Sequence, residues 1–143
     1  MRLGYLLTQN DQIKEIIEKH LPIWNINSLA ERFIELFPQY NNHYNLSIEC
    51  IIQDREKIFS SLNQIDLINP VKSHANFLLC KITNSLTSQE LCERLYEQGF
   101  FIKDCSNKSS LGNKFVRIAV RKENENKKLL LITKQESTNA LAW

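Results

Sequence analysis

Cysteine and histidine are scarce in this sequence, and neither is spaced as a metal site requires. Its 143 residues include four cysteines and three histidines, with no C-x-x-C pair and no H-E-x-x-H motif. A zinc site is therefore not favoured. The cysteine spacing gives no disulfide framework either, so reduced thiols are expected. Glycine and proline are equally rare, with three of each, and we find no internal repeat, no low-complexity segment and no linker that would split the chain.

Long apolar runs are also missing. No stretch reaches the roughly 18 to 20 apolar residues that a membrane-spanning helix needs. The first twelve residues, MRLGYLLTQNDQ, turn polar without a small-residue cleavage site, which argues against a signal peptide. We therefore expect a cytoplasmic protein with no membrane partner.

An excess of charge of one sign is the third absence. The formal net charge is +2, and acidic and basic residues are interleaved. A nucleic-acid-binding protein that relies on bulk charge would normally present a basic face, so no nucleic-acid partner is expected. The length suffices for one domain with a core and is short for a two-domain enzyme.

The first half of the chain reads as largely helical. After a short apolar run at 3–7 that suits a strand, Asn10 and Asp11 can cap a helix that Pro22 ends. Ser28 and Glu31 fit a capping box for a second helix. A long amphipathic helix is predicted from about Tyr44 to Leu62, followed by a loop that ends at 69–70.

The second half changes to a mixture of strands and helices. The segment 76–82 (NFLLCKI) reads as a buried strand, and Thr87 with Glu90 forms a capping box for a helix that Gly99 closes. A short strand at 100–103, a polar loop, a strand at 114–120 and a helix at 123–134 follow. The prediction is an α+β fold, with N-terminal helices followed by a small sheet in the order strand-helix-strand-strand-helix.

Arg117 is the most unusual position, because it interrupts the apolar strand FVRIAV. A guanidinium cannot be buried unpaired at tolerable cost. It meets either solvent or an anion, and arginine can hold a carboxylate through two parallel hydrogen bonds. Strand alternation alone leaves both interpretations open.

Four segments, in the correct order, are similar to the C-terminal part of class I/II aminotransferases that use pyridoxal phosphate (PLP). The branch they resemble is that of histidinol-phosphate aminotransferase and threonine-phosphate decarboxylase. The segments are RLGYLL at 2–7, WNINSLAERF at 24–33, SHANFLL at 73–79, and the stretch 99–130 that contains FVRIAV.

The resemblance implies roles for four residues. Arg117 matches the arginine that binds the α-carboxylate of the amino-acid substrate, and Arg2 matches an arginine that contacts the cofactor phosphate. Asn76 could line the active site. Lys103 stands where the family usually has a second arginine, and a lysine attracts a phosphate or carboxylate only as a point charge.

The resemblance also implies an organisation. Residues 1–40 would be the end of the large domain with its connecting helices, 41–135 the small domain, and 136–143 a tail. The family works as homodimers on an amino acid or an amino-acid phosphate.

In the family, the PLP lysine lies a short way upstream of the arginine that Arg2 matches, in a serine-x-lysine context, and this sequence begins after that point; the serine-x-lysine tripeptide at 106–108 does not occupy that position. PLP chemistry needs that lysine, so we expect weak or no PLP binding and no amino-group transfer by these residues alone. A complementing chain would have to supply the lysine.

Two other interpretations stay open at this point. One is a non-enzymatic ferredoxin-like module that binds a ligand or RNA, since KFVRIAV resembles an aromatic RNA-binding strand. The glycine and second aromatic of that motif are missing, however. The other is a non-functional remnant that exposes an apolar face.

Overall fold

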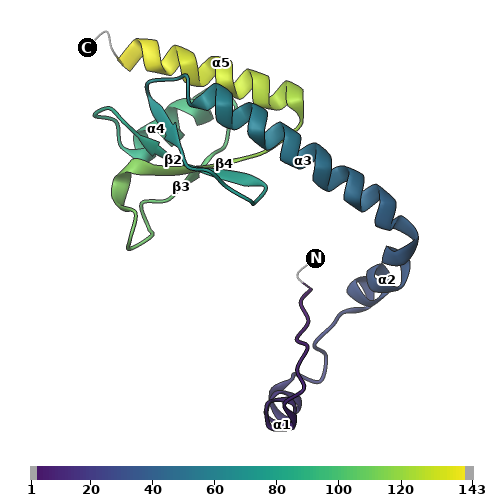
Figure 1. The fold of residues 1–143 in the computed structure, drawn as a ribbon. Coiled ribbons are helices and arrows are strands. Elements are labelled where there is room, and N and C mark those ends of the chain that lie inside the picture. Colours follow the sequence, from purple (N-terminus) through teal and green to yellow (C-terminus); the bar gives the residue numbers. More distant parts are fainter. Residues whose placement is uncertain (1–2, 141–143) are drawn as a thin grey trace. The chain divides into compact units, whose positions relative to one another are not determined.

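The structure is a computed structural model that describes residues 3–140 (Figure 1). The chain divides into two compact units, Met1–Asn45 (unit 1) and Leu46–Trp143 (unit 2). The two units are described separately below. The division predicted from the sequence, with boundaries after residues 40 and 135, stays a prediction.

Unit 1 contains two helices whose starts are fixed by asparagine caps. The Asn10 side chain accepts hydrogen bonds from the amides of Gln12 and Ile13 at the start of α1 (Asp11–His20), as predicted. In α2 (Ser28–Leu36), the cap is Asn27 and not Ser28, so the predicted capping box is wrong by one residue. A short 3-10 helix, η1 (Phe37–Tyr40), follows.

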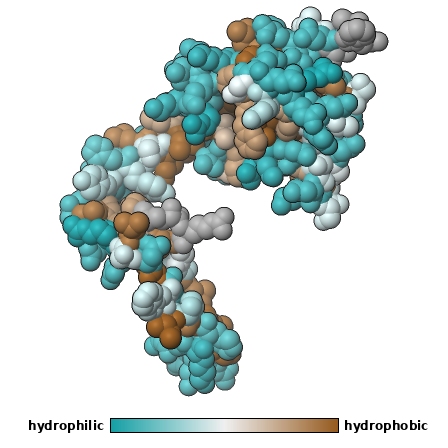
Figure 2. Space-filling view, turned by 180° about the vertical axis from the view of Figure 1, so that it is seen from behind, coloured by the Kyte–Doolittle hydropathy of each residue, from teal (hydrophilic) through white to brown (hydrophobic). Residues whose placement is uncertain are grey.

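The strand predicted at 3–7 is not formed. Tyr5 and Leu7 are 95% and 91% exposed and lie in irregular backbone. An extended segment becomes a strand only when a neighbour supplies the other half of its ladder, and no described residue of unit 1 does so. Ala30 is the only buried residue among 3–45, and the apolar side chains Ile23 and Trp24 are exposed. Figure 2 shows apolar residues, in brown, at the surface of the molecule.

Unit 2 holds a four-stranded antiparallel sheet in the order β1-β2-β4-β3. The strands are β1 (Ile68–Pro70), β2 (Phe77–Ile82), β3 (Lys103–Asp104) and β4 (Phe115–Ala119). The helices are α3 (Asn41–Leu62), which begins in unit 1, α4 (Ser88–Glu97) and α5 (Glu123–Ala140), with a 3-10 turn, η2 (Gly112–Lys114), before β4. The predicted α+β class is confirmed.

The three helices cover one face of the sheet (Figure 1). Alternate residues of β2 and β4 point into this core, as do side chains of each helix. The core side chains of these five elements are Ile58, Leu62, Leu78, Cys80, Ile82, Leu91, Leu95, Val116, Ile118 and Leu129. The burial of alternate residues in β4 confirms the alternation predicted for that strand.

Local signals around α4 are also confirmed. The Thr87 hydroxyl accepts from the Glu90 amide, and the Glu90 carboxylate accepts from the Thr87 amide at 2.7 Å, which completes the capping box. Gly99, just past the helix, has a φ of 82°, the left-handed conformation that favours glycine.

Three elements differ from the prediction. Strand β1 lies where a loop was expected. Strand β3 begins at Lys103, whereas the prediction placed its strand at 100–103. Helix α5 continues to Ala140, beyond the predicted end at Lys134, because buried Glu136 accepts hydrogen bonds from Gln98 (2.8 Å) and Arg94 (3.5 Å) of the α4 region.

Among residues 3–140, no helix combines the length and the apolar content that crossing a bilayer demands.

Candidate functional site

The face of the sheet opposite the helices is the candidate site, and we call it the open face. It is formed by the strand residues that alternate with the core positions. They are Asn69, Phe77, Leu79, Lys81, Lys103, Phe115, Arg117 and Ala119, all exposed or half-buried. Because the register aligns Leu79, Arg117 and Lys103 across three strands, Arg117 lies at the centre of this face.

Arg117 is exposed, and its guanidinium lies over an aromatic ring. Its Cζ is 4.8 Å from the centroid of Phe77, on the neighbouring strand. A guanidinium stacked on a ring face keeps its hydrogen-bond donors at the ring edge, where they are accessible. No carboxylate among the described residues lies within ion-pair distance of it. The donors are therefore available to an anion from outside.

Lys103 is the residue opposite Arg117 on the edge strand β3. Two like charges directly opposite each other in a ladder repel. Lys81 adds a third cation to the open face, and the strand residues of that face include no aspartate or glutamate. An anion bound between Arg117 and Lys103 would relieve the repulsion, so the electrostatics of the face favour an acidic ligand.

Asp104, the acid next in the chain to Lys103, is occupied elsewhere. Its carboxylate accepts from the Ser106 hydroxyl at 2.6 Å and from the Ser106 amide at 2.9 Å. The hydrogen bond from the Ser106 hydroxyl lowers the pKa of Asp104 below its ordinary value, with a smaller contribution from Lys103. Asp104 therefore stays ionised, and it does not neutralise Arg117.

Asn76 and Arg2 are not joined to this arrangement. Asn76 precedes β2, and its backbone carbonyl accepts from the Val120 amide at 2.9 Å. Asn76 lines a separate hollow of about 330 Å³ together with Arg55, His74 and residues of α3. Arg2 lies outside the described residues. The structure thus brings together Arg117 and Lys103, but not Asn76.

Phe77 is the site residue that sequence reasoning missed. Alternation along 76–82 places Phe77 and Leu79 on one face, but a single strand carries no information about its partner. The contact depends on the register that sets Phe77 opposite Ala119 and diagonal to Arg117. The only available signal was an aromatic residue in a predicted strand, and that signal does not identify the arginine as its partner.

No cluster of potential metal ligands occurs in the part of the chain that the structure describes. The open face alone also does not fit PLP. That cofactor needs an acid against its ring nitrogen, and no strand residue of the open face is acidic. What the face can do by itself is bind and orient an anionic ligand.

Known proteins match nearly the whole chain. No model of a protein family matches it. A histidinol-phosphate aminotransferase of Vesicomyosocius okutanii is 30% identical over 135 residues, which are 94% of this chain and 37% of that protein. An L-serine phosphate decarboxylase of Campylobacter jejuni is 29% identical over 91% of this chain and 34% of its own length. The chain thus spans little more than a third of these relatives.

Solved structures of similar enzymes share the fold of this chain. The histidinol-phosphate aminotransferase of Clostridium acetobutylicum superposes with a TM-score of 0.84 at 30% identity, covering 92% of this chain and 40% of that one. The L-threonine-O-3-phosphate decarboxylase of Porphyromonas gingivalis shares the fold, with a TM-score of 0.76 at 22% identity over 91% of this chain and 39% of its own.

Proposed function

This chain belongs to the class I/II PLP-dependent aminotransferases and corresponds to their C-terminal part, and on that premise we propose that its open face binds the substrate of an amino-group transfer. In this proposal Arg117 holds the α-carboxylate of an amino acid through its fork of donors. The observation that carries it is the geometry of Arg117, which is exposed, stacked on Phe77 and unpaired with any described carboxylate.

Lys103 supports a more specific substrate class, an amino-acid phosphate. It lies opposite Arg117, and a lysine acts on a phosphate as a compact point charge. Two relatives act, by their names, on histidinol phosphate and on serine phosphate. We assign Lys103 to the second anionic group of such a ligand. Asn76 would contribute from its separate position, and Arg2 would contact the cofactor phosphate.

In this proposal, the groups that the cofactor chemistry requires are not supplied by the open face. When bound, PLP serves as an electron sink, for which it needs a lysine and an acid at its ring nitrogen. The lysines of the open face, Lys81 and Lys103, do not lie in the family's serine-x-lysine context. In the proposal, polypeptide outside these 143 residues carries the lysine, and this chain contributes substrate binding. The comparisons do not favour a ferredoxin-like RNA-binding module.

The test compares two ligands that differ only in a carboxylate. O-phospho-L-serine carries both a phosphate and an α-carboxylate, whereas phosphoethanolamine carries only the phosphate. We expect the full chain, observed by amide NMR, to bind phosphoserine about tenfold more tightly, corresponding to ~1.4 kcal/mol. Arg117→Gln should abolish that preference. Arg117→Lys, which keeps the charge but loses the fork, should restore little of it.

Lys103→Gln is the matched control, because it should weaken both ligands by the same factor. A preference for phosphoserine that survives in Arg117→Gln would contradict the assignment of the carboxylate. The missing lysine is tested separately by borohydride reduction of the chain mixed with PLP. Peptide mass mapping should find no adduct at a single lysine, and such an adduct would overturn that part of the proposal.

A further inference from the structure

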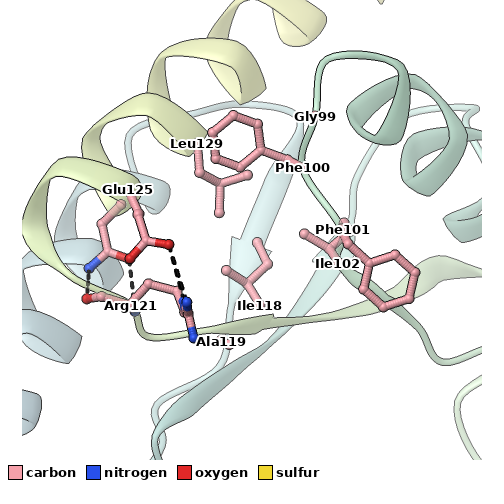
Figure 3. Close-up of a pocket in the computed structure, with 10 residues that line it drawn as sticks. Gly99, Phe100, Phe101, Ile102, Ile118, Ala119, Arg121, Glu125 and Leu129 are labelled. Atoms are coloured by element: carbon pink, nitrogen blue, oxygen red, sulfur yellow. Dashed lines mark hydrogen bonds and ion pairs between the residues drawn. The ribbon is translucent and has the colours of Figure 1, made fainter.

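The ladder between β3 and β4 stops early and leaves the Ala119 backbone without a partner strand on that side. We call this unpaired backbone position the window. The paired residues are Lys103 with Arg117 and Asp104 with Val116. Continuing that register would place Phe101 opposite Ala119. Phe101 is not in a strand, however, and it forms no backbone hydrogen bond with Ala119. Between the two segments lies a pocket of about 370 Å³ (Figure 3).

The Ala119 amide and carbonyl face this pocket. In an antiparallel strand, successive residues direct their N–H and C=O groups to opposite neighbours. The Val120 amide donates to Asn76 on the β2 side, and the Phe115 carbonyl accepts from Cys105 on the β3 side. Ala119 and Phe115 are four residues apart, so their backbone N–H and C=O groups point to the same side of β4. The Ala119 donor and acceptor therefore point away from β2 into the pocket. Ala119 is also exposed.

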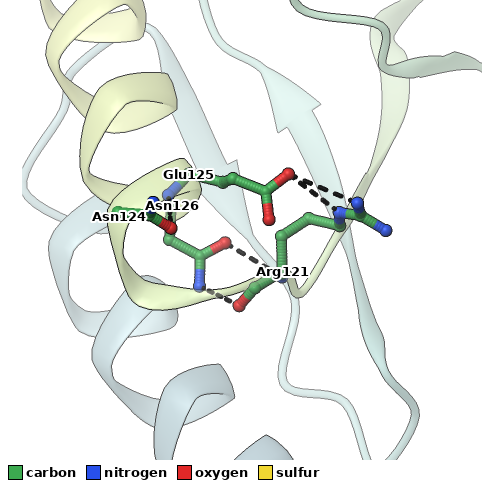
Figure 4. Close-up of polar contacts among 4 residues, drawn as sticks. All are labelled: Arg121, Asn124, Glu125 and Asn126. Carbon is green, nitrogen blue, oxygen red and sulfur yellow. Dashed lines mark hydrogen bonds and ion pairs between the residues drawn. The ribbon is translucent and has the colours of Figure 1, made fainter.

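The window is one residue long, because both of its ends are closed. At one end the partner of Arg117 is Lys103. At the other end the Asn126 side chain takes the place of a strand, accepting from the Arg121 amide at 3.0 Å and donating to the Arg121 carbonyl at 2.7 Å (Figure 4). Glu125 holds the Arg121 guanidinium at 3.3 Å. Only Ala119 retains a free donor and acceptor pair between these closures.

The walls of the pocket differ in character on its two sides. Phe100 points toward Leu129 of α5, and with Ile102 and Ile118 they form an apolar wall, whereas Phe101 points the opposite way (Figure 3). The open-face side carries the cations Arg117 and Lys103. A guest residue paired with Ala119 would direct its side chain to the cationic open face, and its two neighbours would face the apolar wall.

We propose that an extended peptide segment from outside residues 1–143, with an apolar–acidic–apolar sequence, pairs through its main chain with Ala119. Addition of a strand to an open sheet edge is a common mode of peptide recognition, in which main-chain hydrogen bonds give affinity and alternate side chains give specificity. Proteins generally cover such edges. The relatives supply a reason for further polypeptide, since this chain spans 37% and 34% of two of them.

The experiment uses blocked peptides, which lack a free α-carboxylate and so do not depend on the proposed substrate site. Acetyl-Val-Glu-Val-amide is added to the ¹⁵N-labelled full chain, and the Ala119 and Arg121 amide resonances are followed. We expect saturable shifts of both, with roughly fivefold weaker binding of acetyl-Val-Lys-Val-amide because its central charge meets Arg117. Equal shifts from the inverted peptide acetyl-Glu-Val-Glu-amide would overturn the proposal.

Ala119→Pro removes the free N–H and leaves the β2 ladder intact, because the Ala119 amide does not face β2. It should abolish the response of Arg121, whereas the matched control Ala119→Val should retain it. Undiminished binding to Ala119→Pro would also refute the proposal.

If Ala119→Pro does not fold, hydrogen exchange of the unaltered chain decides. The peptide should slow exchange at Ala119 several-fold and leave Val120, already bonded to Asn76, unchanged. An Ala119 amide that is protected without peptide would contradict the window itself.

Discussion

Arg117 and Phe77 face each other diagonally across the β2–β4 ladder, with the guanidinium carbon 4.8 Å from the centroid of the ring. The ring limits the positions that a long and otherwise mobile side chain can take. The Phe77 ring would therefore contribute to ligand binding indirectly, by orienting the guanidinium of Arg117.

The first prediction concerns the contact between Arg117 and the Phe77 ring. Phe77→Leu keeps an apolar side chain but removes the ring, so Arg117 loses an attraction worth about 0.5–1 kcal/mol at exposed sites. We expect the preference for phosphoserine over phosphoethanolamine to fall roughly two- to fivefold. Phe115→Leu is the matched control, since Phe115 is also a half-buried aromatic residue of the open face but makes no ring contact with Arg117. Equal losses in both variants would contradict a specific role for Phe77.

The second prediction tests how α5 is attached. Glu136→Ala removes the acceptor of Gln98 and Arg94, and we expect the free energy of unfolding to fall by about 1–3 kcal/mol in urea denaturation. Glu136→Gln should lower the free energy of unfolding by less, because its amide oxygen can still accept a hydrogen bond from Gln98. Thr138→Ala, an exposed change two residues further on in α5, should stay within about 0.5 kcal/mol of the unaltered chain. An unchanged free energy of unfolding in Glu136→Ala would show that the last turns of α5 do not contribute to stability.

The third prediction is a dependence of stability on pH at the capping box. Hydrogen bonds from Thr87, backbone first and then side chain, lower the pKa of Glu90 in the folded chain from its ordinary value of 4.5. A lowered folded pKa gives stability that is present above the unfolded pKa and is lost as pH falls through the folded one. Thr87→Ala keeps the backbone donor but removes the side-chain hydrogen bonds, so it should destabilise the chain at pH 7, and by less as the pH falls below 4.5. A difference that stays constant from pH 7 to pH 3 would speak against this linkage.

The fourth prediction concerns thiol reactivity. Cys50 is exposed, whereas burial raises the pKa of Cys92 to about 11 and that of Cys80 to about 12. Because the thiolate is the reactive form, a disulfide reagent at pH 8 should modify one thiol rapidly in the folded chain. Cys50→Ser should abolish that rapid phase, and all four thiols should react in urea. A rapid phase that persists in Cys50→Ser would mean that the core around the other cysteines opens readily.

Local signals account for what the sequence could predict. The Asn10 cap, the Thr87–Glu90 box, Gly99 and the alternation around Arg117 depend on residues a few positions apart, and the structure confirms them. The family was also recognisable, because its motifs occur in order.

The features that could not be predicted depend on distant partners. Strand β1 contains Pro70 and follows a loop-like segment, yet it pairs with β2 at the edge of the sheet, where a proline is tolerated. The length of α5 depends on Gln98 and Arg94, which lie about 40 positions earlier in the chain. The window at Ala119 exists because the segment before Lys103 leaves the sheet, and alternation along one strand does not reveal the course of its neighbour.

The single buried side chain among residues 3–45, Ala30, has a calorimetric consequence. The heat capacity of unfolding reports newly hydrated apolar surface, about 12–15 cal/mol/K for each residue of an ordinary globular fold. Unit 1 has almost no such surface to release when its helices melt, so a scanning experiment should record an endotherm sized for unit 2, with the melting of α1 and α2 spread across the baseline.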